Sequence, residues 1–177
     1  SIFTRIFTSQ RMAQMKRLFV MRHGNSDLQE GLSDHKRRLN LRGRQEANKM
    51  AQKILEQGWK IDLAIVSDAT RTTETWTVME RVLCQDTTSI EVLFEPRFYL
   101  TGLGTIQDIL ATQEVRNVLI LGHNPGWSAI VYHLSNRAIE LQTANLVLLE
   151  HHSDSWNEAI HDPQWTMVRF LTPNSLI

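Results

Sequence analysis

The sequence predicts an α/β fold, in which a mostly parallel sheet is covered by helices on both faces. Short, nearly continuous apolar runs rich in β-branched residues occupy positions 18–22, 61–67 and 117–122, as expected of strands that are buried on both faces. Amphipathic segments with helical spacing lie between these runs. The alternation of strand and helix is typical of a parallel sheet joined by right-handed crossovers.

The first helix is predicted over residues 41–57. Asn40 is placed to cap its amino terminus, and Gly58 follows its last turn. Its apolar residues follow the i, i+3, i+4, i+7, i+8 spacing of one buried stripe, and they are Ala47, Met50, Ala51, Ile54 and Leu55. The same pattern predicts three further helices over residues 71–83, 103–112 and 126–134.

Two more apolar segments, 145–150 and 165–171, are predicted strands. The polar stretch between them, HHSDSWNEAIHDP, is predicted to be a surface loop. Its histidines and acids lack the helix-based spacings of zinc enzymes. We therefore expect no metal site there and expect these side chains to be solvated.

Length and composition indicate a folded domain without a strong charge preference. The 177 residues suit one domain, and 19 basic residues balance 19 acidic ones. This balance gives no overall reason to expect nucleic acid or an anionic membrane as partner. Cys84 is the single cysteine, so no intrachain disulfide can form, which suits a reducing, cytoplasmic location. No apolar run approaches the roughly 20 residues of a membrane span.

The amino-terminal segment differs from the rest of the chain. The first 17 residues contain four arginines or lysines and no acid, and apolar residues recur there at helical spacing. We predict that residues 1–16 are an extension and that residues 17–177 form a single domain. A surface arm is the favoured interpretation; a transit segment, with an organellar location, is the alternative.

Basic side chains follow three of the predicted strands. Arg22 and His23 end the first, Arg71 lies just after the second, and His123 ends the third. In an α/β sheet the ligand crevice lies beyond the carboxyl ends of the strands, so we expect these side chains to meet in one pocket. Two guanidiniums and two imidazoles favour a compact dianion, and phosphate is the obvious one.

These residue types suit phosphoryl transfer. Catalysis of that reaction is largely positioning and electrostatic stabilisation, and arginine donates bidentate hydrogen bonds that lysine cannot. A neutral imidazole can attack phosphorus to give a phosphohistidine, which water then hydrolyses. Gly24 lets the loop turn tightly near the phosphate, and a helix that begins near Pro125 or Gly126 adds a positive helix end.

Three segments, LFVMRHGNS, SDATRTTET and ILGHNPG, resemble the histidine phosphatase superfamily in type and order. Further similarity extends over roughly residues 17–172 and is greatest to the SixA-type phosphohistidine phosphatase branch. The resemblance implies a three-layer α/β/α sandwich of the phosphoglycerate mutase type. It also implies that His23 is the phosphorylated nucleophile and that Arg22, Arg71 and His123 bind the phosphate. No cofactor or metal is expected.

The proton donor for the leaving group is not obvious. Mutase-like relatives take it from a glutamate in an inserted segment, and Glu95 lies in roughly the corresponding place. A capping or solvated role for Glu95 is the favoured interpretation, and the proton donor is the alternative. Asp27 is a second candidate because it lies near His23. A missing acid would favour phosphohistidine as substrate, because an imidazole leaving group needs less help. Asn25 either bonds a phosphate oxygen or satisfies its own backbone in a turn.

The favoured function is a metal-independent phosphatase that acts on protein phosphohistidine or on a small phosphomonoester. A phosphoryl transferase or mutase of the same fold is one alternative, which the short chain argues against. A non-catalytic phospho-binding module is the other, and the four intact pocket residues argue against it.

Overall fold

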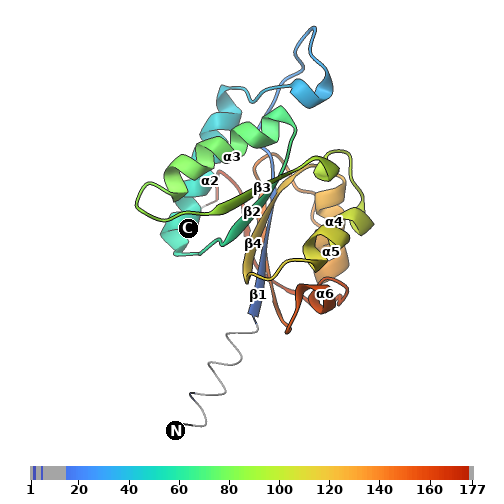
Figure 1. The fold of residues 1–177 in the computed structure, drawn as a ribbon. Helices are drawn as coiled ribbons and strands as arrows, with labels where there is room; N and C mark the ends of the chain where they lie inside the picture. The colour runs from blue at the N-terminus through green and yellow to red at the C-terminus, as the bar shows by residue number, and fades with distance from the viewer. Residues whose placement is uncertain (1, 3–4, 6–14, 176–177) are drawn as a thin grey trace.

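The computed structural model describes residues 2, 5 and 15–175, which build one six-stranded sheet in the order β3-β2-β4-β1-β5-β6 (Figure 1). The strands are β1 (Met15–Arg22), β2 (Leu63–Ser67), β3 (Glu91–Glu95), β4 (Asn117–Gly122), β5 (Leu146–His152) and β6 (Thr166–Leu171). Strands β1 to β4 pair in parallel, whereas β5 is antiparallel to β1 and β6 is antiparallel to β5. The mostly parallel sheet is confirmed.

Helices cover both faces of the sheet (Figure 1). On one face lie α2 (Leu41–Gln57) and α3 (Thr70–Leu83), and on the other lie α4 (Leu103–Ala111), α5 (Gly126–Ser135) and α6 (Trp156–Ala159). The central strand β1 contributes to both cores, because alternate side chains of a strand point to opposite faces. Leu18 and Val20 pack with α4 and α5, while Phe19 and Met21 pack with α2 and α3. The predicted three-layer sandwich is confirmed.

The predicted helices begin and end within one residue of the observed ones. At the start of α2 the Asn40 side chain accepts a hydrogen bond of 2.8 Å from the backbone N–H of Gly43. At its end Gly58 has the left-handed φ of 69° that favours glycine. Local capping therefore explains why this helix could be predicted from the sequence.

One strand was not predicted, and the prediction of one surface loop was wrong. The edge strand β3 was missed because its Leu93 and Phe94 are exposed, so the segment lacks a buried apolar run. The expected surface loop at 151–163 contains α6, and Trp156 is fully buried and donates through Nε1 to the Val115 carbonyl at 2.5 Å. His151, expected to be solvated, is largely buried and bonds Asp162 at 2.8 Å.

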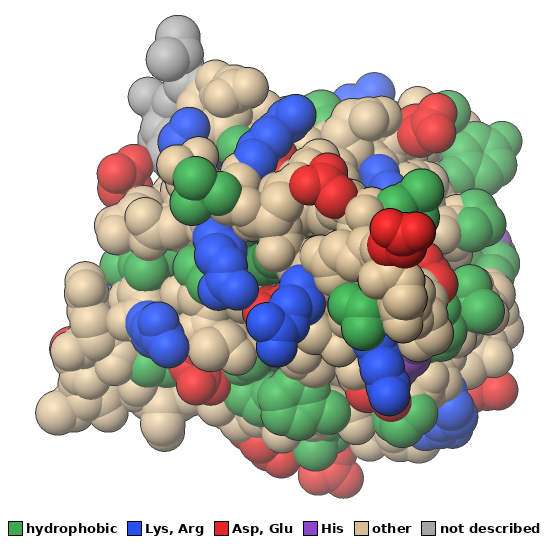
Figure 2. Space-filling view, turned by 90° about the horizontal axis from the view of Figure 1, so that it is seen from above, with side chains coloured by type: hydrophobic (Ala, Val, Ile, Leu, Met, Phe, Trp, Pro, Cys, Tyr) green, Lys and Arg blue, Asp and Glu red, His purple; other side chains and the backbone are tan. Residues whose placement is uncertain are grey.

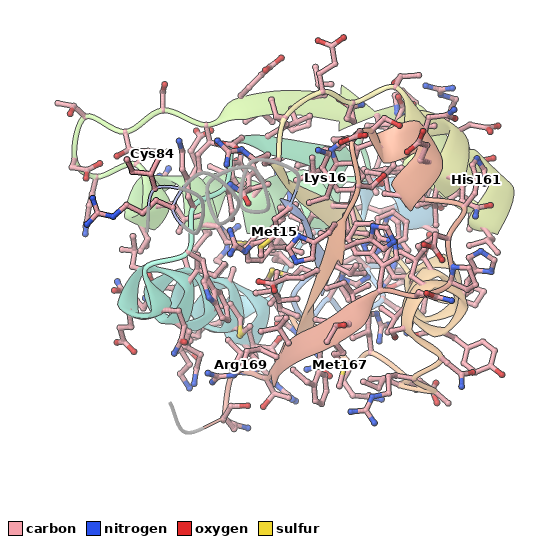
Figure 3. The ribbon with its side chains drawn as sticks, turned by 90° about the horizontal axis from the view of Figure 1, so that it is seen from below. Met15, Lys16, Cys84, His161, Met167 and Arg169 are labelled. Carbon is pink, nitrogen blue, oxygen red and sulfur yellow. The ribbon has the colours of Figure 1, made fainter. Side chains whose placement is uncertain are left out.

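The amino terminus is described only in part. β1 begins at Met15, earlier than the apolar run that predicted it, and Met15 and Lys16 lie at the lower end of the sheet (Figure 3). The predicted extension over residues 1–16 falls mostly outside the described residues. No helix among the described residues combines the length and the apolar character needed to cross a membrane.

The loop after β1 packs tightly against the first turn of α2. A Cβ built on Gly24 would lie 2.6 Å from the carbonyl oxygen of Gly43, and one built on Gly43 would lie 2.2 Å from the carbonyl oxygen of Asn25. Both contacts involve backbone atoms, which cannot move aside as a flexible side chain would. Two glycines are therefore required where this loop meets the helix.

We expect Gly24→Ala to lower the free energy of unfolding by about 1–3 kcal/mol, because the added methyl group must push the loop and the helix apart. Urea denaturation measures the change. Gly104→Ala is the matched control, since nothing lies within 4 Å of a Cβ built there. Equal stability of the two variants would contradict the expected clash.

Candidate active site

His23 follows the carboxyl end of β1 and is almost fully buried, with 6% of its surface exposed. Its Nδ1 lies 2.7 Å from the Gly24 carbonyl, which can only accept, so Nδ1 carries the proton. Nε2 is then unprotonated and accepts a hydrogen bond of 3.3 Å from Arg71 Nε. Burial, with a further contribution from Arg71, lowers the pKa of His23 to about 3. The ring is therefore neutral at neutral pH, with its lone pair on Nε2.

Arg71 lies in the first turn of α3 and contacts residues on two sides of the site. One edge of the guanidinium faces the histidines, with Nε at 3.3 Å from His23 and Nη2 at 3.5 Å from His123 Nδ1. The other edge holds Asp34, with Nη1 donating to its carbonyl at 2.7 Å and Nη2 to its carboxylate at 3.2 Å. The edge toward the histidines is the one available to a bound anion.

His123 follows the carboxyl end of β4, and its ring centre lies 5.2 Å from that of His23. Its Nε2 bonds Ser67 Oγ at 2.7 Å, and Thr72 Oγ1 lies 3.5 Å away. Both hydroxyl side chains are fully buried, so they fix the ring. Burial, followed by repulsion from His23 and Arg71, lowers the pKa of His123 to about 3.

Arg22 brings a second guanidinium to this end of the sheet. Nη1 donates to the Leu141 carbonyl at 3.1 Å, whereas Nε is buried and has no hydrogen-bond partner among the described residues. Burial and the nearby charge of Arg71 lower the pKa of Arg22. A buried donor without an acceptor, close to a second cation, is an arrangement that an anion would stabilise.

Buried side chains hold the loop after β1 in place. The N–H of Gly24 donates to Thr75 Oγ1 at 3.1 Å, and that hydroxyl donates to the Arg71 carbonyl at 2.7 Å. The N–H of Asn25 donates to Glu46 at 2.9 Å. The loop that carries His23 is therefore tied to both α2 and α3.

Three further residues predicted from the sequence, Asn25, Glu95 and the exposed Asp27, lie less centrally. The side-chain oxygen of Asn25 accepts a hydrogen bond of 2.5 Å from Asn40 Nδ2, so this oxygen already has a partner within the protein. The Glu95 carboxylate accepts from the backbone N–H, Nε and Nη2 of Arg97 at 2.9–3.1 Å. These bonds lower the pKa of Glu95, and all three join it to Arg97, not to the four central residues. Its role as proton donor stays a prediction that this geometry does not favour.

Three residues of the site were missed by sequence reasoning. Asp34 bonds Arg71, and Tyr99 contacts both Asp34 and His123. These contacts join residues far apart in the sequence, and no local sequence pattern predicts them. Glu46 did carry a signal, because it is a charged residue on the buried stripe of α2. A buried carboxylate in a helix stripe needs polar partners, and here these are Asn25 and Thr143.

Viewed from above, this end of the molecule carries several Lys and Arg side chains with Asp and Glu side chains among them (Figure 2). Arg37 donates through Nε to Asp34 Oδ1 at 3.0 Å. Arg42 is 71% exposed and lies 3.8 Å from Glu46. Within the described residues, no group of three or more histidine, cysteine or acidic side chains could hold a metal ion.

The lowered pKa values predict that acid destabilises the protein. Below a pH of about 6.5 the unfolded chain takes up protons at His23 and His123, whereas the folded chain does so only near a pKa of about 3. The free energy of unfolding should thus fall by about 1 kcal/mol per histidine and pH unit within this window. Urea denaturation at about pH 7.5 and about pH 5 measures it. His123→Gln should show a smaller fall, and an equal fall would contradict this explanation.

Known proteins resemble this chain in sequence and in fold. A family model described as the histidine phosphatase superfamily, branch 1, matches residues 18–98. An uncharacterised chloroplastic protein of Arabidopsis thaliana is 33% identical over 175 residues, which cover 92% of this chain and 80% of that protein. The chain belongs to the histidine phosphatase superfamily.

Solved structures share the fold of this histidine phosphatase. A candidate phosphohistidine phosphatase SixA from Agrobacterium tumefaciens superposes with a TM-score of 0.75 at 24% identity, covering 90% of this chain and 99% of that one. The protein histidine phosphatase SixA in complex with tungstate gives 0.73 at 22% identity, covering 89% and 97%. These similar structures establish the phosphoglycerate mutase-like fold. Membership of the superfamily identifies the protein as a phosphatase.

Proposed function

We propose that this histidine phosphatase hydrolyses phosphorylated substrates through a phosphohistidine intermediate on His23, without a metal ion. The observation that carries the proposal is the neutral His23 imidazole with its Nε2 lone pair beside Arg71 and His123. A buried nucleophile among cationic and hydrogen-bonding groups suits attack on a phosphoryl group.

The proposed reaction has two steps. His23 Nε2 attacks phosphorus, the bond to the leaving group breaks, and the phosphoryl oxygens are held by Arg22, Arg71 and His123. Water then attacks the phosphohistidine, and phosphate leaves as the imidazole is restored. The His23 Nδ1–H to Gly24 bond keeps the ring in the tautomer that both steps need.

We favour protein phosphohistidine over a phosphomonoester as substrate. An alkoxide leaving group needs a proton, whereas Arg97 holds the Glu95 carboxylate in its ionised form and Asp27 is exposed. A phosphohistidine ring whose second nitrogen is already protonated departs as neutral imidazole and needs no proton from the enzyme. The tungstate bound to a SixA protein of the same fold supports a tetrahedral oxyanion as the ligand.

The test compares turnover of a phosphohistidine-bearing carrier protein and p-nitrophenyl phosphate, each with and without a chelator. We expect activity to survive chelation and a brief reaction with labelled substrate to leave an acid-labile label on the protein. Loss of activity on chelation would overturn the metal-independent mechanism. Tight phosphate binding without turnover would favour a phospho-binding module.

The amino-terminal residues bear on the cellular location of the protein. The chloroplastic relative supports the organellar alternative, in which residues 1–16 act as a transit segment. Fusing these residues to a fluorescent protein and following its import tests this alternative. A cytoplasmic distribution of the fusion would contradict it.

A further inference from the structure

Asp34 holds the edge of Arg71 that faces away from the histidines. It accepts through its carbonyl from Nη1 and through its carboxylate from Nη2, whereas Nε and the other side of Nη2 face His23 and His123. A guanidinium has five N–H donors in a fixed plane. Arg71 can therefore bind Asp34 and a phosphoryl group at the same time, so the carboxylate stays in place during the reaction.

The difference in burial between His23 and Asp34 indicates on which side of the site the leaving group lies. His23 is 6% exposed, whereas the Asp34 side chain is 51% exposed. In an in-line displacement the leaving group departs on the side opposite the attacking atom. Because the nucleophile lies at the floor of the site, the leaving group lies toward the mouth, where Asp34 is.

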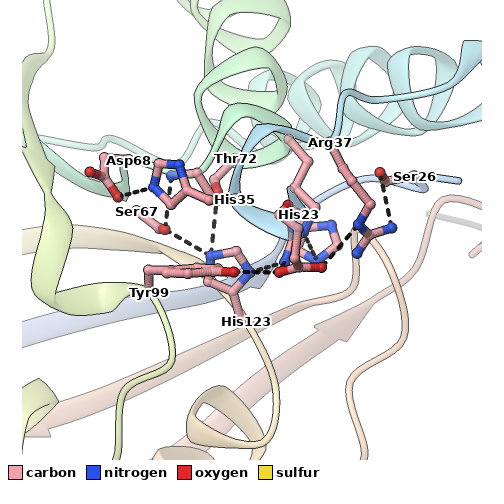
Figure 4. Close-up of polar contacts among 12 residues, drawn as sticks. His23, Ser26, His35, Arg37, Ser67, Asp68, Thr72, Tyr99 and His123 are labelled. Atoms are coloured by element: carbon pink, nitrogen blue, oxygen red, sulfur yellow. Dashed lines mark hydrogen bonds and ion pairs between the residues drawn. The ribbon is translucent and has the colours of Figure 1, made fainter. Parts of the chain in front are cut away.

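Tyr99 fixes the carboxylate at this mouth. Its hydroxyl donates to Asp34 Oδ2 at 2.5 Å, and Arg37 donates to Oδ1 at 3.0 Å (Figure 4). The Tyr99 ring itself packs edge-on to His123, with ring centres 5.6 Å apart. The Tyr99 bond, aided by Arg71 and Arg37, lowers the pKa of Asp34 to about 2. The group at the mouth is thus an ionised acceptor, which cannot donate a proton to an alkoxide.

We propose that Asp34 selects the leaving group, by accepting a hydrogen bond from the ring N–H of a phosphohistidine imidazole. This inference rests on the proposed function and adds the residue that sets its specificity. An N–H donor on the leaving group meets a fixed carboxylate, whereas an oxyanion there meets a like charge. The site therefore favours phosphoramidates of imidazole over phosphate esters.

The bonds balance without a proton transfer in the first step. His23 Nε2 forms the new N–P bond, and the P–N bond of the substrate breaks with its electron pair left on the substrate nitrogen. The substrate ring enters as the imidazolium, with phosphorus on one nitrogen and a proton on the other. Asp34 accepts a hydrogen bond from that N–H, and the ring departs as neutral imidazole. Asp34 remains ionised throughout.

The test measures kcat/KM of Asp34→Asn on the phosphohistidine carrier protein and on p-nitrophenyl phosphate, whose leaving group needs no proton. Loss of support for Arg71 should lower both values, so the ratio of the two isolates the leaving-group effect. We expect that ratio to fall about 100-fold. Asp34→Glu should restore part of it. Asp162→Asn, which alters a partly exposed carboxylate paired with His151 away from the site, should keep the wild-type ratio.

An equal fall on both substrates would show that Asp34 only positions Arg71 and would overturn the inference. The same holds if Asp34→Glu leaves the ratio as low as Asp34→Asn does. A wild-type protein that turns over neither substrate would instead overturn the proposed function, and this inference with it. Circular dichroism of each variant establishes that it is folded.

Discussion

His23→Ala is expected to reduce turnover of the phosphohistidine carrier protein and of p-nitrophenyl phosphate by at least about 10⁴-fold, as loss of a covalent nucleophile does elsewhere. The remaining donors at Arg71 and His123 would still bind phosphate. Water would then have to attack directly, from a cavity where the buried imidazole stood. Activity should therefore fall far more than affinity for inorganic phosphate.

Three measurements separate this loss from unfolding. Single-turnover kinetics give the rate, titration with inorganic phosphate gives the affinity, and gel analysis of labelled enzyme gives the acid-labile phosphate. His161→Ala is the control, because His161 is exposed on the lower part of the molecule (Figure 3). Acid-labile label that persists in His23→Ala would place the intermediate on another residue and contradict the proposal.

The parts of the fold that could be predicted are those that local sequence determines. Helix α2 has its cap in Asn40 and its end in Gly58, and its buried stripe is visible in the sequence. The strands β1, β2 and β4 are buried almost throughout and read as apolar runs. In contrast, β3 is half exposed and forms through pairing with β2, which no pattern within five residues can show.

The same distinction holds for the site. Each of His23, Arg71 and His123 follows or begins an element that the sequence predicts, so the topology of a parallel sheet brings them together. Asp34 begins a single 3₁₀ turn (Asp34–Lys36) and Tyr99 follows another (Pro96–Phe98). These short turns have no periodic sequence pattern, and their positions depend on how the connecting segments pack. No predicted strand or helix carries either residue, so the sequence could not indicate that Tyr99 bonds Asp34, 65 positions away.

Arg71→Lys is expected to lower kcat/KM about 10³-fold on both substrates, because it removes a bidentate donor while keeping a positive charge. Lysine has one nitrogen and cannot bond His23, His123 and Asp34 from two edges, as the guanidinium does. Charge alone would leave the phosphoryl oxygens poorly oriented. The expected loss of kcat/KM therefore comes from the lost arrangement of the guanidinium donors more than from a lost charge.

Arg71→Met distinguishes the two contributions. Arg71 lowers the pKa of both His23 and His123, so its neutral replacement should raise both values. The acid limb of the pH–rate profile should then move to higher pH in Arg71→Met and less in Arg71→Lys. Arg44→Met, which removes an arginine paired with Glu74 on the surface of α2, is the control. If Arg71→Lys kept more than a tenth of the activity, charge would suffice and the bidentate role of Arg71 would be wrong.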